Sequence, residues 1–125
     1  MVLRVSSGRF MHRLRGLNML LLSTKGRRTG QSKETPLLYL EDGGQYYCAA
    51  SFGGNNKHPQ WYLNLVAGPT VGLLVKQRRV TAIATVLSGQ EYREAWTKLV
   101  GCYPPFAKYQ NRTERAIPVV RFSPI

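Results

Sequence analysis

Short segments in which apolar residues alternate with polar or small ones recur along most of the chain. This two-residue period is typical of β-strands with one buried face, and the clearest example runs from Val80 to Leu87. Between two such segments, Asp42 followed by two glycines is a strong signal for a tight hairpin turn. We predict six antiparallel strands, over residues 18–24, 35–41, 45–50, 71–75, 80–87 and 118–122.

Apolar residues return at helical spacing in one long segment that follows the fifth strand. Ser88 and Glu91 at its start have the spacing of a capping box, in which each side chain satisfies a free backbone donor. The predicted buried face consists of Tyr92, Ala95, Trp96, Leu99, Val100 and Tyr103. We predict this helix over residues 89–103, a shorter helix over 60–66, and a turn or short helix over 106–112.

Six short strands with two or three short helices define a mainly β (α+β) fold. That strand count suits a closed or split antiparallel barrel better than an open sandwich. We expect residues 17–125 to form a single barrel domain, and residues 1–16 to form a separate basic N-terminal segment. Part of that segment, residues 9–16, has the pattern of a short basic amphipathic helix. Such a helix either rests on an anionic membrane or packs on the barrel.

The first predicted hairpin carries an unusual concentration of positive charge. Gly26 and Gly30 lie four residues apart between two apolar runs, as expected of a hairpin loop. The cations in and beside this loop are Lys25, Arg27, Arg28 and Lys33. A tight turn with clustered cations and free N–H groups is a good anion site. A solvated tip that discourages edge pairing fits the same residues.

The charge of the whole chain supports an anionic partner. Eighteen Lys and Arg residues face six Asp and Glu residues, which gives a net charge of +12. The imbalance is greatest near the N-terminus, because no acidic residue precedes Glu34. Such a surface attracts phosphates, polycarboxylates, nucleic acid or anionic lipid. The cations cluster in one hairpin and the N-terminus rather than alternating with aromatics on a strand face, so we expect no nucleic-acid partner.

The remaining chemistry-bearing residues exclude several classes of site. Cys48 and Cys102 lie in apolar surroundings, so we expect two reduced, buried thiols in a cytoplasmic protein. His12 and His58 have no partners at metal-ligand spacing, so no metal site is predicted. The apolar run over residues 17–22 is too short to span a bilayer, and no small-residue cleavage site follows it. Attachment to the inner face of the cell membrane through weak anionic-lipid contact stays open.

No nucleophile triad, P-loop or dinucleotide fingerprint is present, so an enzyme of this kind needs a cofactor to carry its chemistry. The chain resembles the deazaflavin-dependent nitroreductase family from about Leu20 to Phe122. The resemblance rests on Lys-Gly-Arg-Arg-Thr-Gly within residues 20–33, on Gly-Gly-Asn-Asn-Lys-His-Pro within residues 49–65, and on Tyr-Pro-Pro-Phe within residues 103–113. The first two runs are specific in combination.

This resemblance implies a six-stranded split β-barrel similar to FMN-binding proteins. It also implies that the cofactor is coenzyme F420, an 8-hydroxy-5-deazaflavin with a phosphate and a polyglutamate tail. The implied activity is that of an oxidoreductase, which transfers hydride from reduced F420 to a quinone, a nitroimidazole or a similar electron-poor acceptor. We expect a monomer or a dimer that acts on a small quinone or nitroaromatic molecule.

The resemblance assigns the cofactor to two stretches of the chain. Arg27, Arg28 and Lys33 would bind the anionic tail and phosphate, a role that suits the forked donors of arginine. The loop 51–54 would place backbone N–H groups along the phosphate and ring edge, and Trp61 would pack near the ring. The implied cofactor-binding residues are Arg27, Arg28, Lys33, Ser51, Phe52, Gly53, Gly54, Gln60 and Trp61. On residue type alone, Trp61 also suits the core and Ser51 also suits a loop cap.

The implied substrate rim consists of Tyr103, Phe106 and Tyr109. Of these, Tyr103 and Tyr109 are the candidate catalytic residues, which would orient the acceptor or relay a proton. The chain departs from the family at three positions. Phe52 replaces a common lysine, Gln60 replaces a common methionine, and Phe106 lacks a hydroxyl. The cofactor class is therefore better defined than the acceptor.

Two other classes of function also fit parts of the pattern. One is a basic barrel without catalysis that binds nucleic acid or anionic membrane, because the net charge suits it equally well. The other is an FMN-dependent, oxidase-like relative on the same barrel. The affinities for F420 and for FMN discriminate among the three.

Overall fold

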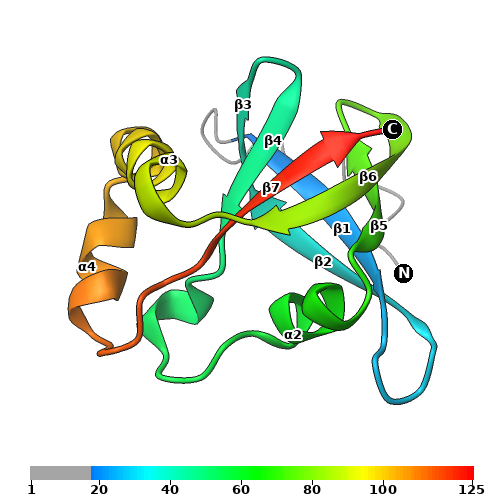
Figure 1. Ribbon diagram of the computed structural model, residues 1–125, viewed down its shortest axis with the longest axis horizontal. Helices are drawn as coiled ribbons and strands as arrows, with labels where there is room; N and C mark the ends of the chain where they lie inside the picture. The colour runs from blue at the N-terminus through cyan, green and yellow to red at the C-terminus, as the bar shows by residue number, and fades with distance from the viewer. Residues whose placement is uncertain (1–17) are drawn as a thin grey trace.

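In the computed structural model, which describes residues 18–125, seven antiparallel strands form one strongly curled sheet with the order β2-β1-β5-β6-β7-β4-β3 (Figure 1). The strands are β1 Met19–Lys25, β2 Ser32–Leu38, β3 Leu40–Asp42, β4 Gln45–Ala49, β5 Thr70–Val75, β6 Arg78–Val86 and β7 Val119–Pro124. The helices are the 3-10 turn η1 Phe52–Gly54, α2 Gln60–Ala67, α3 Gly89–Cys102 and α4 Pro105–Asn111. The predicted basic segment 1–16 lies outside the described residues.

The sheet closes on itself at Tyr39, which explains why seven strands replace the predicted six. The second predicted strand is split there, so that β2 pairs with β1 at one edge while β3 pairs with β4 at the other. The Tyr39 N–H donates to the Asn18 carbonyl at 2.9 Å, and its buried ring packs edge-on against Tyr46. A mainly β split barrel is confirmed, because one bent segment supplies both edges of the sheet.

Two apolar cores lie on the two sides of the sheet. The inner core fills the barrel and includes Leu20, Leu22 and Phe122, all fully buried. The outer core lies between the sheet, α3 and α4, and includes Leu99 and Val119. Alternation along the strands separates the two sets, and each fully buried Leu or Phe contributes roughly 1.5–3 kcal/mol to folding.

The predicted turns and helices form, but the capping box does not. Gly43 and Gly44 make a two-residue turn with φ of 62° and 78°, which glycine adopts without strain. The Ser88 side chain makes no cap hydrogen bond, and the Glu91 carboxylate accepts a bond from Arg121 at 2.7 Å instead. None of the helices in residues 18–125 is long and apolar enough to cross a bilayer.

The prediction of two buried thiols is half wrong. Cys48 is fully buried in the inner core, and burial raises the pKa of its thiol. Cys102, the last residue of α3, is exposed. Residue 102 follows Ala95 and Leu99 on the same face of α3, but it is the last residue of the helix and lies beyond the last buried position of that face. Neither cysteine is in a disulfide.

Candidate functional site

The basic loop between β1 and β2 is a defined six-residue structure rather than a tight turn, because Lys25 pairs with Ser32 across the hairpin. The Gly26 N–H donates to the Gln31 carbonyl at 2.7 Å, and the Gly30 N–H donates to the Gly26 carbonyl at 2.8 Å. Gly30 has a φ of 73°, and a Cβ on Gly26 would lie 2.8 Å from the Thr29 hydroxyl oxygen. Both glycines are therefore required by the loop geometry.

Asn64 attaches this loop to helix α2. Its buried Oδ1 accepts from the Arg27 backbone N–H at 3.2 Å and from Arg27 Nη1 at 2.8 Å. Sequence reasoning missed Asn64, although a signal was available. It lies on the same face of α2 as Trp61 and Leu65, so an amide occupies a buried position of an otherwise apolar helix face.

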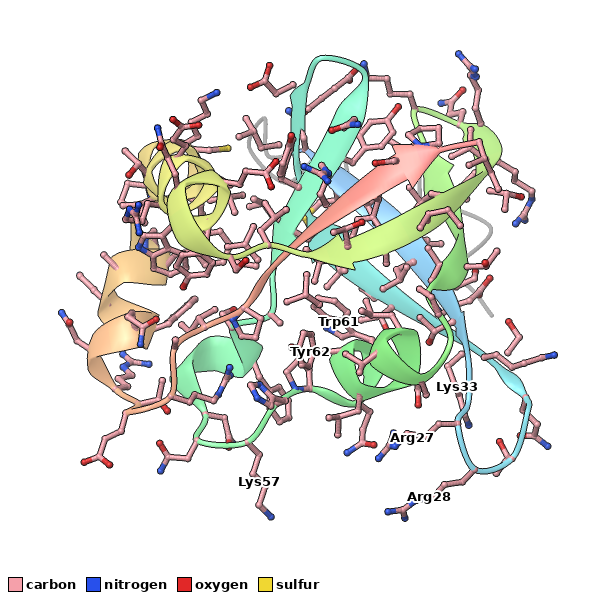
Figure 2. All side chains as sticks on the ribbon, in the orientation of Figure 1. Arg27, Arg28, Lys33, Lys57, Trp61 and Tyr62 are labelled. Atoms are coloured by element: carbon pink, nitrogen blue, oxygen red, sulfur yellow. The ribbon has the colours of Figure 1, made fainter. Side chains whose placement is uncertain are left out.

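A cavity of about 410 Å³ opens between the basic loop, β2 and α2. Figure 2 shows Arg27, Arg28 and Lys33 together at this end of the molecule, beside α2. The residues that line it are Gly26, Arg27, Arg28, Thr29, Lys33, Glu34, Thr35, Gln60, Trp61 and Asn64. Three cations thus face the cavity with one acidic residue, and five of the predicted cofactor-binding residues share one site.

Trp61 is both a core residue and a wall of this cavity. Its side chain is 7% exposed and belongs to the inner core, and its ring meets Tyr62 edge-on at 6.4 Å. Gln60, at the start of α2, is exposed and gives the same cavity a polar edge. The two interpretations of Trp61, as core and as pocket residue, are therefore compatible.

The predicted phosphate loop lies apart from this cavity, against helix α4. Gly54 is buried with a φ of 80°, and a Cβ there would lie 2.8 Å from the Tyr109 carbonyl oxygen. Phe52 has a φ of 48°, which is unusual for a residue with a side chain, and it is 56% exposed. Ser51 makes no side-chain cap bond. None of residues 51–54 lines the 410 Å³ cavity.

Arg115 holds the loop, a contact that sequence reasoning missed. Its Nε donates to the Asn55 carbonyl at 2.8 Å and its Nη2 to the Ser51 carbonyl at 2.8 Å. Its Nη1 donates to the Ala50 carbonyl at 3.2 Å and lies 3.2 Å from His58 Nδ1. No local pattern identifies these contacts, because 57 to 65 residues separate the partners in sequence.

His58 faces Arg115 on one side and the Tyr62 ring on the other, at a centroid distance of 4.8 Å. Burial, and secondarily the Arg115 charge, lower the pKa of His58 below its usual value. A neutral imidazole with an unprotonated Nδ1 accepts the Arg115 hydrogen bond, whereas an imidazolium has no acceptor to offer.

The predicted substrate rim comes together at α4. The Tyr103 and Tyr109 hydroxyls are 3.5 Å apart, and the Phe106 ring lies 5.0 Å from the Tyr103 ring. Phe106 is only 5% exposed, so it supports the two tyrosines from the outer core. The hydrogen bond to Tyr109, together with burial, raises the pKa of Tyr103, so its hydroxyl keeps its proton at neutral pH. Arg112 lies over the Tyr109 ring at 5.7 Å.

Comparison with known proteins gives consistent results in sequence and in structure. A sequence model of the family described as F420H(2)-dependent quinone reductase matches residues 1–124. F420H(2)-dependent quinone reductase Rv1261c of Mycobacterium tuberculosis strain H37Rv is 38% identical to this chain, and the match covers 95% of this chain and 83% of that protein.

Two solved structures are similar to this chain over most of its length. One is described as an F420-H2 dependent reductase (FDR-A), with 37% identity, a TM-score of 0.79, and coverage of 85% of this chain and 94% of that chain. The other is described as a domain-swapped dimer, with 33% identity, a TM-score of 0.79, and coverage of 98% and 97%.

Proposed function

The chain belongs to the F420H(2)-dependent quinone reductase family, and from that membership we propose that it reduces quinones with reduced coenzyme F420. The protein is thus an oxidoreductase, as the sequence resemblance implied. The family supports this interpretation over both alternatives, the basic barrel without catalysis and the FMN-dependent relative. The observation that carries the proposal is the 410 Å³ cavity in which Arg27, Arg28 and Lys33 converge beside Trp61.

The residues of this cavity fit an anionic cofactor tail. Within the described part of the chain, the side chains of Arg28 and Lys33 make no hydrogen bond or ion pair, so their donors are available to a ligand. Arg27 uses Nη1 on Asn64, which orients its guanidinium at the cavity wall. Phosphate and glutamate carboxylates bind well to forked arginine donors. We assign the tail to these cations and the ring region to the side of Trp61, Gln60 and the loop 51–54.

Coenzyme F420, when bound and reduced, supplies the hydride that an electron-poor ring accepts. The protein supplies position: Trp61 and Gln60 form a partly apolar, partly polar wall, and Tyr103 and Tyr109 offer two neighbouring hydroxyls. We propose that these tyrosines orient the acceptor or deliver a proton to the reduced product. The buried Phe106 ring packs between Trp96 and Tyr103 and so supports the two tyrosines.

The test is a binding titration followed by a reoxidation assay with the wild-type chain. We expect F420 to bind more tightly than FMN, with an affinity that falls as salt is added. A soluble quinone should then reoxidise reduced F420, seen as the return of the visible absorbance of the oxidised deazaflavin. Equal affinity for FMN and F420, or no quinone-dependent reoxidation, would contradict the proposal.

We further propose that nitroimidazoles are poorer acceptors than quinones for this chain. A nitroimidazole needs a tighter pose for hydride delivery, and a misplacement of ~1 Å can reduce the rate about a hundredfold. Phe106 offers no hydroxyl to a nitro group and is buried. Side-by-side turnover with a quinone and a bicyclic nitroimidazole checks this order, which faster nitroimidazole turnover would reverse.

A cytoplasmic location and a weak, salt-sensitive contact with anionic membrane also remain proposals. Their support is the net charge of +12 and the unpaired cysteines. Sedimentation with anionic and with neutral vesicles tests the membrane contact, and equal sedimentation counts against it. Size-exclusion chromatography distinguishes monomer from dimer.

A further inference from the structure

Arg115 lies in the link between α4 and β7, at some distance from the basic cavity, yet three of its side-chain nitrogens contact one loop. Their acceptors are the carbonyls of Ala50, Ser51 and Asn55 and the ring nitrogen of His58. No carboxylate pairs with Arg115 within residues 18–125. Its charge is therefore directed at backbone oxygens, and charge-assisted bonds of this kind are stronger than those between neutral groups.

The loop needs such a contact because its backbone is strained. Phe52, Gly53 and Gly54 all have positive φ, and a residue with a side chain in that region costs energy that its surroundings must offset. Gly54 closes against the Tyr109 backbone on one side. Arg115 draws the carbonyls before and after the turn together on the other side.

Arg115 is itself anchored to α4. The Gln110 Nε2 donates to the Arg115 carbonyl at 2.8 Å, and the Ile117 N–H donates to Gln110 Oε1 at 2.9 Å. Through Arg115, the loop is therefore connected to α4, the helix that carries Tyr109. With its carbonyls held by Arg115, the loop leaves the N–H groups of Phe52 and Gly53 without a hydrogen-bond partner among residues 18–125.

We propose that Arg115 is the positioning residue of the loop 51–54, which it holds in the backbone conformation that binds the cofactor. This rests on the proposed function, in which that loop contacts F420. Lysine cannot replace arginine here, because a single ammonium lacks the planar fork that reaches three carbonyls at once. The Arg115→Lys variant therefore keeps the charge and loses the geometry.

The test compares Arg115→Lys with Arg93→Lys, a change of the same kind at an exposed position on α3. Without cofactor, hydrogen exchange should accelerate in residues 51–58 of Arg115→Lys, while β5 and β6 stay protected. In the assay, the KM for reduced F420 should rise roughly tenfold or more, with little change in the KM for quinone. Arg93→Lys should match the wild type in both measurements.

Three outcomes would overturn the positioning role. Unchanged exchange in residues 51–58 would show that Arg115 does not hold the loop. Loss of protection in β5 and β6 as well would show that it supports the whole fold. An equal rise in both KM values, or a fall in kcat alone, would also contradict a role specific to the cofactor loop. If the wild-type chain does not bind F420, the proposed function fails, while the exchange measurement still decides whether Arg115 holds the loop.

Discussion

Arg27 and Arg115 illustrate two uses of an arginine that has no carboxylate partner among residues 18–125. Arg27 uses its backbone N–H and Nη1 on Asn64 and faces an open cavity. Arg115 uses Nε, Nη1 and Nη2 on acceptors of one loop. Arg27 therefore keeps side-chain donors for a ligand, whereas Arg115 uses its side-chain donors on backbone carbonyls of the protein.

The difference shows that a basic residue count does not locate an anion site. The sequence places Arg27 and Arg115 in equally polar stretches, and only the direction of their donors separates a ligand-binding role from an internal one. We therefore expect changes in charge at the basic loop to alter cofactor binding. Near α4, we expect changes in side-chain geometry to matter more than changes in charge.

Removal of the tail-binding cations should have the largest effect. The double variant Arg27→Ala/Arg28→Ala loses two sets of charge-assisted bonds worth ~1.5–3 kcal/mol each, so F420 should bind roughly a hundredfold more weakly or worse. The control Arg78→Ala/Arg79→Ala removes the same charge from exposed positions on β6 and should bind normally. Titration by fluorescence quenching measures both, and equal affinities in the two variants would disprove the tail site.

A smaller loss should follow from a negative charge behind Arg27. Asn64→Asp keeps an acceptor for Arg27, and its carboxylate offsets the positive charge of the Arg27 guanidinium. The F420 affinity should therefore fall roughly tenfold and depend less on salt. Asn111→Asp makes the same chemical change at an exposed position of α4 and serves as the control. The salt dependence decides the matter, because an unchanged slope would mean that Arg27 does not contact the tail.

The two tyrosine hydroxyls should matter for the acceptor and not for the cofactor. Tyr103→Phe and Tyr109→Phe each break the 3.5 Å contact between the hydroxyls and keep both rings. We expect the quinone KM to rise a few-fold, about 1 kcal/mol for one neutral hydrogen bond, with unchanged F420 affinity. Steady-state kinetics with either substrate varied test this. A rise in the F420 KM instead would indicate that these hydroxyls contact the cofactor rather than the acceptor.

The smallest expected effect is a dependence of stability on pH at His58. Its pKa is lowered in the folded state by burial and by Arg115, so the unfolded chain binds the proton more readily. Stability is then retained above the ordinary histidine pKa of about 6.5 and decreases as the pH falls below it. Thermal melts of wild type and His58→Gln from neutral to mildly acidic pH compare the two. An identical decline in both would exclude His58 as its source.

Local patterns predicted most of the elements correctly. The long helix, its buried face, the turn at Gly43 and Gly44, and the glycine-bounded basic loop all depend on residues close together in sequence. The capping box was wrong for a non-local reason, because Arg121 on a distant strand engages Glu91. The split of one strand at Tyr39 likewise follows from pairing with two different neighbours, which no single segment reveals.

The amino-acid sequence was sufficient for the mainly β fold, the charged loop and the cofactor family, because alternation, glycine positions and contiguous motifs are local properties. The cavity beside α2, the Asn64 contact and the Arg115 contact with its loop depend on the tertiary structure. They bring together residues that lie 37 to 65 positions apart in the chain. The tertiary fold determines which donors meet which acceptors across such distances. Residue type alone does not identify these pairs.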